Sequence, residues 1–173
     1  MALPRRRPSA RLFGALAVIV CFAAVTSASA IAQNAPEYGA RPSPIGGTPR
    51  SQLAFVHAIE SGSSVADAVD VINHANTPAT FDVYAVDLVP SANGGRAPAP
   101  RSAATTGPGA WVAVTEGSVV VEPFGTREVP FVIEVPVGTA PGNYIASLIV
   151  ESTEAAGTGT IIARTRIALR IEV

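Results

Sequence analysis

Residues 127–152 read REVPFVIEVPVGTAPGNYIASLIVES, and the fold of the chain follows from this stretch. Two runs of alternating apolar residues flank a segment rich in proline and glycine. The first run places Val129, Phe131 and Ile133 on one face, and residues 144–150 repeat the pattern. Apolar residues at every second position are typical of a strand, because successive side chains point to opposite faces. We therefore predict that this stretch is the inner β-hairpin of an all-β domain.

Short runs with the same alternation recur along the rest of the chain, separated by turn residues, and no helical periodicity follows residue 32. Turns at intervals of about 8–12 residues are typical of sandwiches. We predict an immunoglobulin-like antiparallel β-sandwich of about 7–9 strands, although the cysteine framework of antibody domains is absent. Further strands are predicted at residues 51–59, 65–74, 79–89, 111–114, 118–121 and 160–173.

The first 32 residues have the pattern of a signal peptide. Four arginines lie within the first 11 residues, residues 12–25 are apolar, and small residues at Ala28 and Ala30 offer a cleavage site. The apolar run is short for a retained membrane anchor, which needs about 20 residues. Residues 33–50 are rich in proline and glycine and predict a flexible linker. The domain organisation expected is therefore 1–32 signal peptide, 33–50 linker and 51–173 β-sandwich.

The charge of the chain argues against two classes of partner. The chain has 12 arginines, no lysine and 13 acidic residues, which gives a net charge of −1. Without residues 1–32, the chain has eight arginines and 13 acidic residues, and the net charge is 8 − 13 = −5. Nucleic acids and anionic membrane surfaces attract basic patches. We therefore expect no nucleic-acid partner and no binding to an anionic membrane surface. Because the short apolar run at residues 12–25 is expected to be removed with the signal peptide, we also expect no membrane span in the mature chain.

The sequence offers little for catalysis. His57 and His74 have no partner at the spacing of metal ligands. Two pairs of aspartates share a predicted strand, Asp67 with Asp70 and Asp82 with Asp87. Each pair is separated by an odd number of residues, so its members face opposite sides of the sheet, and a solvated strand face is expected for them. We predict that the protein is not an enzyme and needs no cofactor or metal.

Five residues are candidates for ligand binding: Trp111, Tyr84, Asn93, Arg96 and Arg101. The aromatic rings are possible stacking platforms for sugars, and the loop side chains are donors for a carboxylate or hydroxyl. Each has a plainer alternative. Trp111 also fits the core where the sandwich closes, and Tyr84 alternates with core residues. Residues 90–110, which hold the other three, also fit a solvated loop without a function.

Tyr144 follows a Pro-Gly pair at the start of a strand. This placement resembles a tyrosine corner, which is a packing device of β-sandwiches.

Several patches together resemble one protein family. They are Glu60-Ser61-Gly62, Val69 with Val71 and Asn73, Tyr84-Ala85-Val86-Asp87, Asn93-Gly94-Gly95, Trp111-Val112, Pro123-Phe124-Gly125, Val135-Pro136 and Pro141-Gly142. Their order over residues 51–152 is similar to the N-terminal, peptidoglycan-binding domain of WxL-interacting proteins in its actinobacterial form. The resemblance implies an immunoglobulin-like fold, an association with the bacterial cell wall and no catalytic motif.

Two functional hypotheses remain open. The first is an exported, non-enzymatic module of the cell envelope that associates with peptidoglycan or with cell-wall proteins, so that the protein is secreted and cell-wall associated. The alternative is a protein-binding β-sandwich of chaperone or adhesion type that works by strand pairing. The well-alternating final strand, residues 160–173, motivates the alternative.

Overall fold

The computed structural model describes residues 37–48, 50, 54–153 and 166–172, which belong to a compact unit spanning Ala35–Val173. The predicted signal peptide lies outside these residues. Within the described ranges, no helix is long and apolar enough to cross a bilayer.

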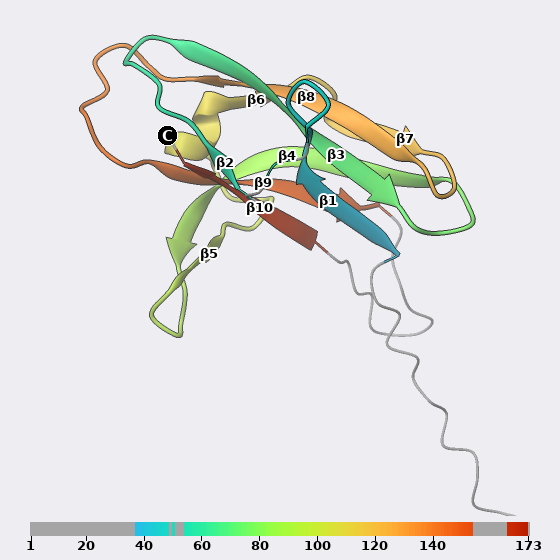
Figure 1. The fold of residues 1–173 in the computed structure, drawn as a ribbon. Helices are drawn as coiled ribbons and strands as arrows, with labels where there is room; N and C mark the ends of the chain where they lie inside the picture. The colour runs from blue at the N-terminus through green and yellow to red at the C-terminus, as the bar shows by residue number, and fades with distance from the viewer. Residues whose placement is uncertain (1–36, 49, 51–53, 154–165, 173) are drawn as a thin grey trace, which may run out of the picture. The chain divides into compact units, whose positions relative to one another are not determined.

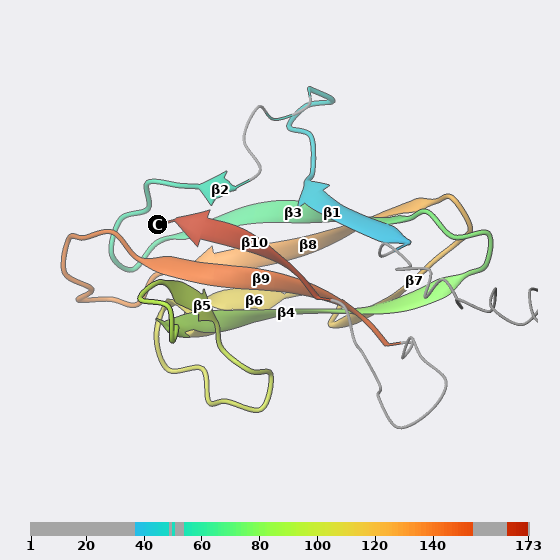
Figure 2. The same ribbon diagram turned by 90° about the horizontal axis from the view of Figure 1, so that it is seen from below.

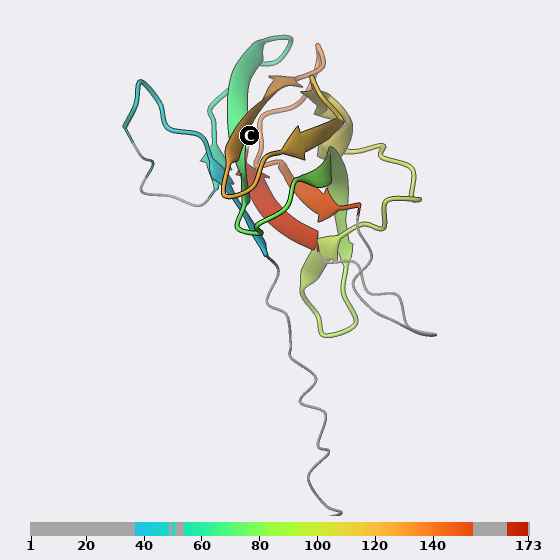
Figure 3. The ribbon, with the colours of Figure 1, turned by 90° about the vertical axis from the view of Figure 1, so that its right-hand side faces the viewer.

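Two β-sheets pack face to face, as Figures 1 and 3 show. The four-stranded sheet has the order β1 (Tyr38–Pro42), β3 (Ser64–Asn73), β8 (Thr126–Glu134) and β6 (Val112–Val114). The six-stranded sheet has the order β2 (Phe55–Val56), β10 (Arg166–Glu172), β9 (Ile145–Ser152), β4 (Ala79–Pro90) and β5 (Arg96–Pro98), and β7 (Ser118–Val121) also pairs with β4. Neighbouring strands are antiparallel except β2 and β10. The described part is thus an immunoglobulin-like antiparallel β-sandwich, which confirms the predicted fold class.

The core lies between the sheets and comes from the alternation in the sequence. In the second half of β8, Val129, Phe131 and Ile133 are buried, while the residues between them are exposed or half-buried. The ring of Phe131 packs edge-on against Phe55 at 4.9 Å, and the ring of Tyr38 packs on Phe81 at 5.0 Å. Offset and edge-to-face pairs of this kind add to the burial of apolar area. The strand that begins the described chain therefore contributes to the same core as the central strands.

The predicted hairpin at residues 127–152 is wrong. Both strands exist, but β8 pairs with β3 and β6 in one sheet, whereas β9 pairs with β4 and β10 in the other. The ten residues 135–144 carry the chain from one sheet to the other. Alternation shows that a strand has one buried face, but it does not identify the neighbouring strand. The connection is also longer than the loops of two to five residues that usually close a hairpin.

The predicted linker is also partly wrong, because β1 lies inside residues 33–50. All five residues of β1 are in register with β3, from Tyr38 opposite Asn73 to Pro42 opposite Val69. Proline is tolerated at an edge strand, where its missing N–H faces away from the ladder. The chain then crosses to the other sheet, where β2 joins the C-terminal end of β10 (Figure 2).

The remaining predicted strands are found, one with the same ends and the others with shifted ends. The run at 65–74 is β3, that at 79–89 is β4, and that at 118–121 is β7. Of the run at 51–59 only Phe55–Val56 is a strand, and residues 51–53 lie outside the described ranges. Trp111 ends a short 3₁₀ helix, η1 (Pro108–Trp111), and β6 follows it. The last strand covers Arg166–Glu172, and residues 160–165 are not described.

Candidate functional site

The five residues predicted to bind a ligand do not form one site. Tyr84 and Arg101 meet on the outer face of the six-stranded sheet. Asn93 and Arg96 are exposed at the β4–β5 hairpin, where the Asn93 side chain accepts a hydrogen bond from Ser91 Oγ at 2.7 Å. Trp111 lies next to the core instead. Ligand binding by these residues stays a prediction.

Tyr84 and Arg101 are bound by groups of their own chain. The Tyr84 hydroxyl donates to Glu151 Oε2 at 2.7 Å. The Arg101 guanidinium lies 4.6 Å from the centre of the Tyr84 ring and donates to Asp82 at 2.5 Å. Burial, followed by the hydrogen bond to Glu151, raises the pKa of Tyr84 to about 12. The ring is therefore covered by a cation and is not an open platform for a sugar.

The long connection after β4 is folded onto the sheet. Val86 and Ile149 of the sheet and Ala99 of the connection form a second, small apolar core on the outer face. Asp87 accepts hydrogen bonds from the backbone N–H groups of residues 106, 107 and 109 at 2.7–2.9 Å. Burial opposes the ionisation of Asp87, but these three donors outweigh it, so the pKa of that carboxyl falls below its usual value. Parts of residues 90–110 are thus anchored to the sheet by apolar and polar contacts, whereas Asn93, Arg96 and Arg101 within them are exposed.

Trp111 packs on Tyr144, with ring centres 4.8 Å apart. Both side chains are half-buried, and Trp111 also contacts the main core together with Val112 and Val114. The Tyr144 hydroxyl donates to the Ala140 carbonyl at 2.7 Å. A tyrosine that returns its hydroxyl to the backbone a few residues upstream has the geometry of a tyrosine corner. This agrees with the packing alternative for both aromatic residues.

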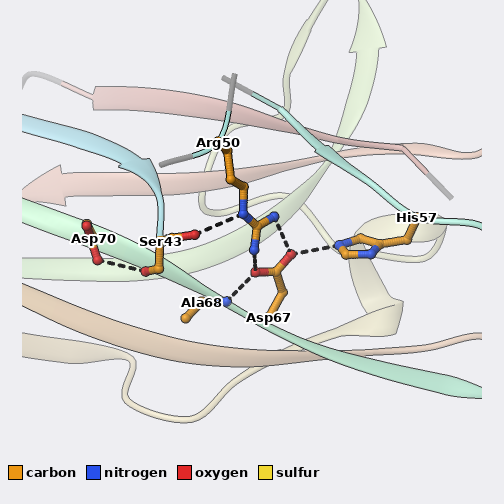
Figure 4. Close-up of polar contacts among 6 residues, drawn as sticks. All are labelled: Ser43, Arg50, His57, Asp67, Ala68 and Asp70. Atoms are coloured by element: carbon orange, nitrogen blue, oxygen red, sulfur yellow. Dashed lines mark hydrogen bonds and ion pairs between the residues drawn. The ribbon is translucent and has the colours of Figure 1, made fainter. Parts of the chain in front are cut away.

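A buried carboxylate, Asp67, was missed by the sequence analysis. Its side chain is 3% exposed and accepts hydrogen bonds from both terminal nitrogens of Arg50 (Figure 4). His57 Nε2 lies 2.8 Å from Asp67 Oδ2, and the backbone N–H of Ala68 donates to Oδ1 at 2.7 Å. The expected solvated strand face is therefore wrong for Asp67. Its oxygens are occupied by partners, so this centre holds the fold together and is poorly suited to act as a base.

The neighbouring acid on the opposite face of β3, Asp70, has the same role. Its carboxylate accepts a hydrogen bond from Ser43 Oγ at 2.7 Å and pairs with Arg41 at 3.1 Å. Its side chain is only 8% exposed, so the solvated face is wrong here too. Together Asp67 and Asp70 fix the segment between β1 and β2 onto β3. One signal was present in the sequence: Asp67 is two residues from Val69, so both point into the core, where a carboxylate needs a cation.

A cleft of about 300 Å³ opens at one end of the sandwich, between the turn after β2 and the β8–β9 connection. Its walls are largely apolar. The lining residues are Ile59, Glu60, Ser61, Val135, Thr139, Ala140, Pro141, Gly142 and Tyr144. Ligand pockets span about 300–1,000 Å³, so this cleft has room for one side chain or a group of similar size.

The cleft is held in shape by hydrogen bonds between its two loops. Ser61 Oγ donates to the Pro136 carbonyl at 3.2 Å and accepts from the Gly138 N–H at 2.8 Å. Gly62 N–H donates to Val135 O at 3.0 Å from a left-handed conformation. A side chain on Gly62 would also lie only 3.0 Å from Val137. The turn therefore needs glycine at this position.

Within the described residues, no group of three or more histidine, cysteine, aspartate or glutamate side chains is placed to hold a metal ion.

Comparison with known proteins finds likeness in structure only. No protein-family model and no curated protein matches the chain. A family 123 glycoside hydrolase from Clostridium perfringens is similar over 79% of this chain and 27% of its own, with a TM-score of 0.49 and 12% identity. The E. coli chaperone DraB is similar over 79% of this chain and 54% of its own, with a TM-score of 0.48 and 9% identity. The PapD-like domain 7 of human CEP192 matches over 79% and 82%, with a TM-score of 0.46 and 15% identity. Identities and scores this low transfer no function to this chain.

Proposed function

We propose that this protein is a protein-binding β-sandwich that captures an extended segment of its partner along the edge of β10. One observation carries the proposal. β10 is in register with β9 over its whole length, from Arg166 to Glu172. On its other side, among the described residues, β10 is paired only at Ile171 and Glu172, where β2 lies beside it. The edge from Arg166 to Arg170 is thus unpaired as far as the described chain extends, and such an edge can accept a further strand.

The charged residue Arg166 on β10 favours pairing with a specific partner strand over pairing with unrelated strands. Arg166 and Ala168 are exposed on β10, and charged side chains at an edge discourage pairing with apolar strands of unrelated chains. The Arg166 guanidinium itself is directed over the sheet, where it donates to the Ala99 carbonyl at 3.2 Å and lies 6.0 Å from the centre of the Tyr84 ring. The six-stranded sheet behind this edge is also firmly packed, because Leu148 and Val150 of β9 are fully buried. The edge is therefore backed by a rigid surface.

The geometry supports a protein partner ahead of a bare glycan. The Tyr84 ring lies under Arg101, and the Trp111 ring packs on Tyr144, so neither offers an open face for a sugar. The family resemblance supplies the cellular setting, and we propose that the protein is exported and that its partner is a protein of the bacterial cell wall. We further propose that it binds without catalysis and without a cofactor, since Asp67 and Asp87 are occupied by hydrogen bonds of the fold.

Site-specific photo-crosslinking tests the strand edge. A photoreactive residue at Ala168, exposed on β10, is compared with one at Glu128, which is exposed in the middle of β8. We expect the first variant to cross-link one envelope protein and the second to cross-link none. Amide hydrogen exchange of residues 166–170 should slow once the purified partner is added. Equal cross-linking from both positions, or unchanged exchange in β10, would refute pairing at this edge.

Sedimentation with purified cell walls tests direct binding to peptidoglycan, the second candidate that the resemblance favours. If the partner is a protein, the chain should stay in the supernatant with walls stripped of protein and pellet with untreated walls. Equal recovery in both pellets would favour peptidoglycan as the ligand and argue against our proposal.

A further inference from the structure

The cleft at the end of the sandwich has apolar walls and one available charge. The walls are formed by Ile59, Val135, Pro141 and the ring of Tyr144. The hydroxyl groups that line it are all engaged within the chain. Ser61 and Thr139 each donate to the Pro136 carbonyl, and Tyr144 donates to Ala140. The cleft therefore has few polar atoms left to recognise a sugar.

Glu60 differs from the other polar side chains that line the cleft. Its side chain lines the cleft and is exposed, and it forms no hydrogen bond or ion pair with any residue that the structure describes. Glu134, which immediately precedes Val135, is likewise exposed and unpaired in the described part of the chain. The local charge at this end is negative. A ligand that fits must combine an aliphatic portion for the walls with a positive charge at the rim.

We propose that this cleft binds a lysine side chain of a partner protein. A lysine has this chemistry, because its four-carbon stem packs along apolar surface while its ammonium group stays at the water boundary. It suits the cleft better than an arginine, because among the described residues the cleft offers one free carboxylate, whereas a guanidinium presents five donors in a planar fork. The stem would lie against Ile59, Val135 and Pro141, and the ammonium would pair with the Glu60 carboxylate. This chain contains 12 arginines and no lysine, so a second copy does not supply the ligand.

The cleft is ready to bind because both loops are already fixed. Gly62 N–H donates to Val135 O, and Val135 N–H donates to Ser63 O, each at 3.0 Å. The Ser61 hydroxyl ties the same turn to Pro136 and Gly138. Binding to a fixed site avoids the cost of ordering loops. The inference does not depend on strand pairing at β10, since the cleft involves other residues.

Peptide titration by NMR tests the proposal with the full chain. The first probe is a short peptide of alanine and threonine with one central lysine, and the second carries norleucine, which keeps the stem and lacks the charge. We expect the lysine peptide to shift the methyl signals of Ile59 and Val135. It should bind about two- to fivefold more tightly than the norleucine peptide, the range expected for an exposed ion pair.

Two variants distinguish the effect of the Glu60 charge inside the cleft from the effect of negative charge elsewhere at this end of the sandwich. In Glu60→Gln the preference for lysine over norleucine should disappear, whereas Glu134→Gln, which removes a charge that does not line the cleft, should retain it. Both positions are exposed, and an unchanged spectrum of the core confirms that each variant folds. Shifts that avoid the cleft, equal binding of the two peptides, or a lysine preference that survives Glu60→Gln would overturn the proposal. None of these readouts involves β10.

Discussion

At the scale of single residues, the Asp67 carboxylate joins several segments of the fold. It is almost fully buried, and two cationic or potentially cationic side chains, Arg50 and His57, contact it. Replacing one partner of such a group is costly, because the others are left buried without a counter-charge. The sequence distance between Asp67 and Arg50 also means that one substitution affects two segments of the chain.

We therefore expect Asp67→Asn to lower the free energy of unfolding by roughly 3–5 kcal/mol. Urea denaturation monitored by circular dichroism measures the change. Glu116→Gln is the matched control, because it removes one partner of an ion pair with Arg127 in which both side chains are about half-exposed. Exposed pairs contribute about 0–1 kcal/mol, so this control should be nearly neutral. A loss of equal size in the two variants would contradict the role assigned to Asp67.

The raised pKa of Tyr84 predicts that the stability of the fold depends on pH in the alkaline range. Burial, followed by the hydrogen bond to Glu151, raises the pKa of Tyr84 from 10.0 to about 12. Between these values the unfolded chain loses its phenolic proton while the folded chain retains it. The contribution of Tyr84 to stability is thus complete below pH 10.0 and lost as the pH rises toward about 12. Denaturation at a series of alkaline pH values should show a shallower decline for Tyr84→Phe than for the unchanged chain, and identical declines would disprove this.

At the scale of elements, the connection between β4 and β6 depends on a close backbone approach at Gly109. A Cβ at this position would lie 2.5 Å from the Val86 carbonyl carbon and 2.7 Å from the Asp87 nitrogen. No backbone atom can accept such a contact without moving. The N–H of Gly109 also donates to the Asp87 carboxylate at 2.7 Å. A glycine here lets the connection rest on the sheet.

Gly109→Ala should lift the connection from the outer face and lower stability by roughly 1–3 kcal/mol, as overpacking does elsewhere. Limited proteolysis should cut residues 91–110 faster in this variant. Gly95→Ala lies in the same connection and is the control, since its Cβ would have Asn93 Oδ1 as its nearest neighbour, at an ordinary 3.7 Å. If both variants resist protease as the unchanged chain does, the connection is not held as described.

The elements also show what local sequence can and cannot predict. Alternation placed β3, β4, β7, β8 and β9 within a few residues of their ends, because burial of one face is a local property. It did not identify their neighbours, so β8 and β9 were wrongly joined as a hairpin. Proline and glycine in YGARP concealed β1, although an edge strand tolerates both. The cleft depends on two loops more than 70 residues apart, and no local pattern reports that contact.

At the scale of the whole molecule, the structure moves the start of the folded unit from residue 51 to Ala35. The segment that a cut at residue 51 would remove contains β1, Ser43 and Arg50. Tyr38 is 7% exposed and packs on Phe81, so this segment belongs to the core as well as to the sheet edge.

Two truncated chains test the boundary. Residues 35–173 should unfold cooperatively with the same midpoint as the full chain. Residues 51–173 should lose cooperative thermal unfolding or melt at a much lower temperature, because Asp67 loses Arg50 and β3 loses β1, one of its two neighbouring strands. Calorimetry distinguishes these results. Equal melting of the two truncated chains would restore the interpretation of residues 33–50 as a linker.

The switch of the chain from β1 in one sheet to β2 in the other has a mechanical consequence. β2 runs parallel to β10, so tension applied at the two ends of the folded unit pulls these strands in opposite directions along their length. Their hydrogen bonds are then loaded together in shear instead of one at a time. Arg50 precedes β2 in the chain and is bound to Asp67 of β3, so this contact takes up load from the N-terminal end before β2 does. A module tethered at one end and bound to a partner at the other would resist stretching through this short parallel pair.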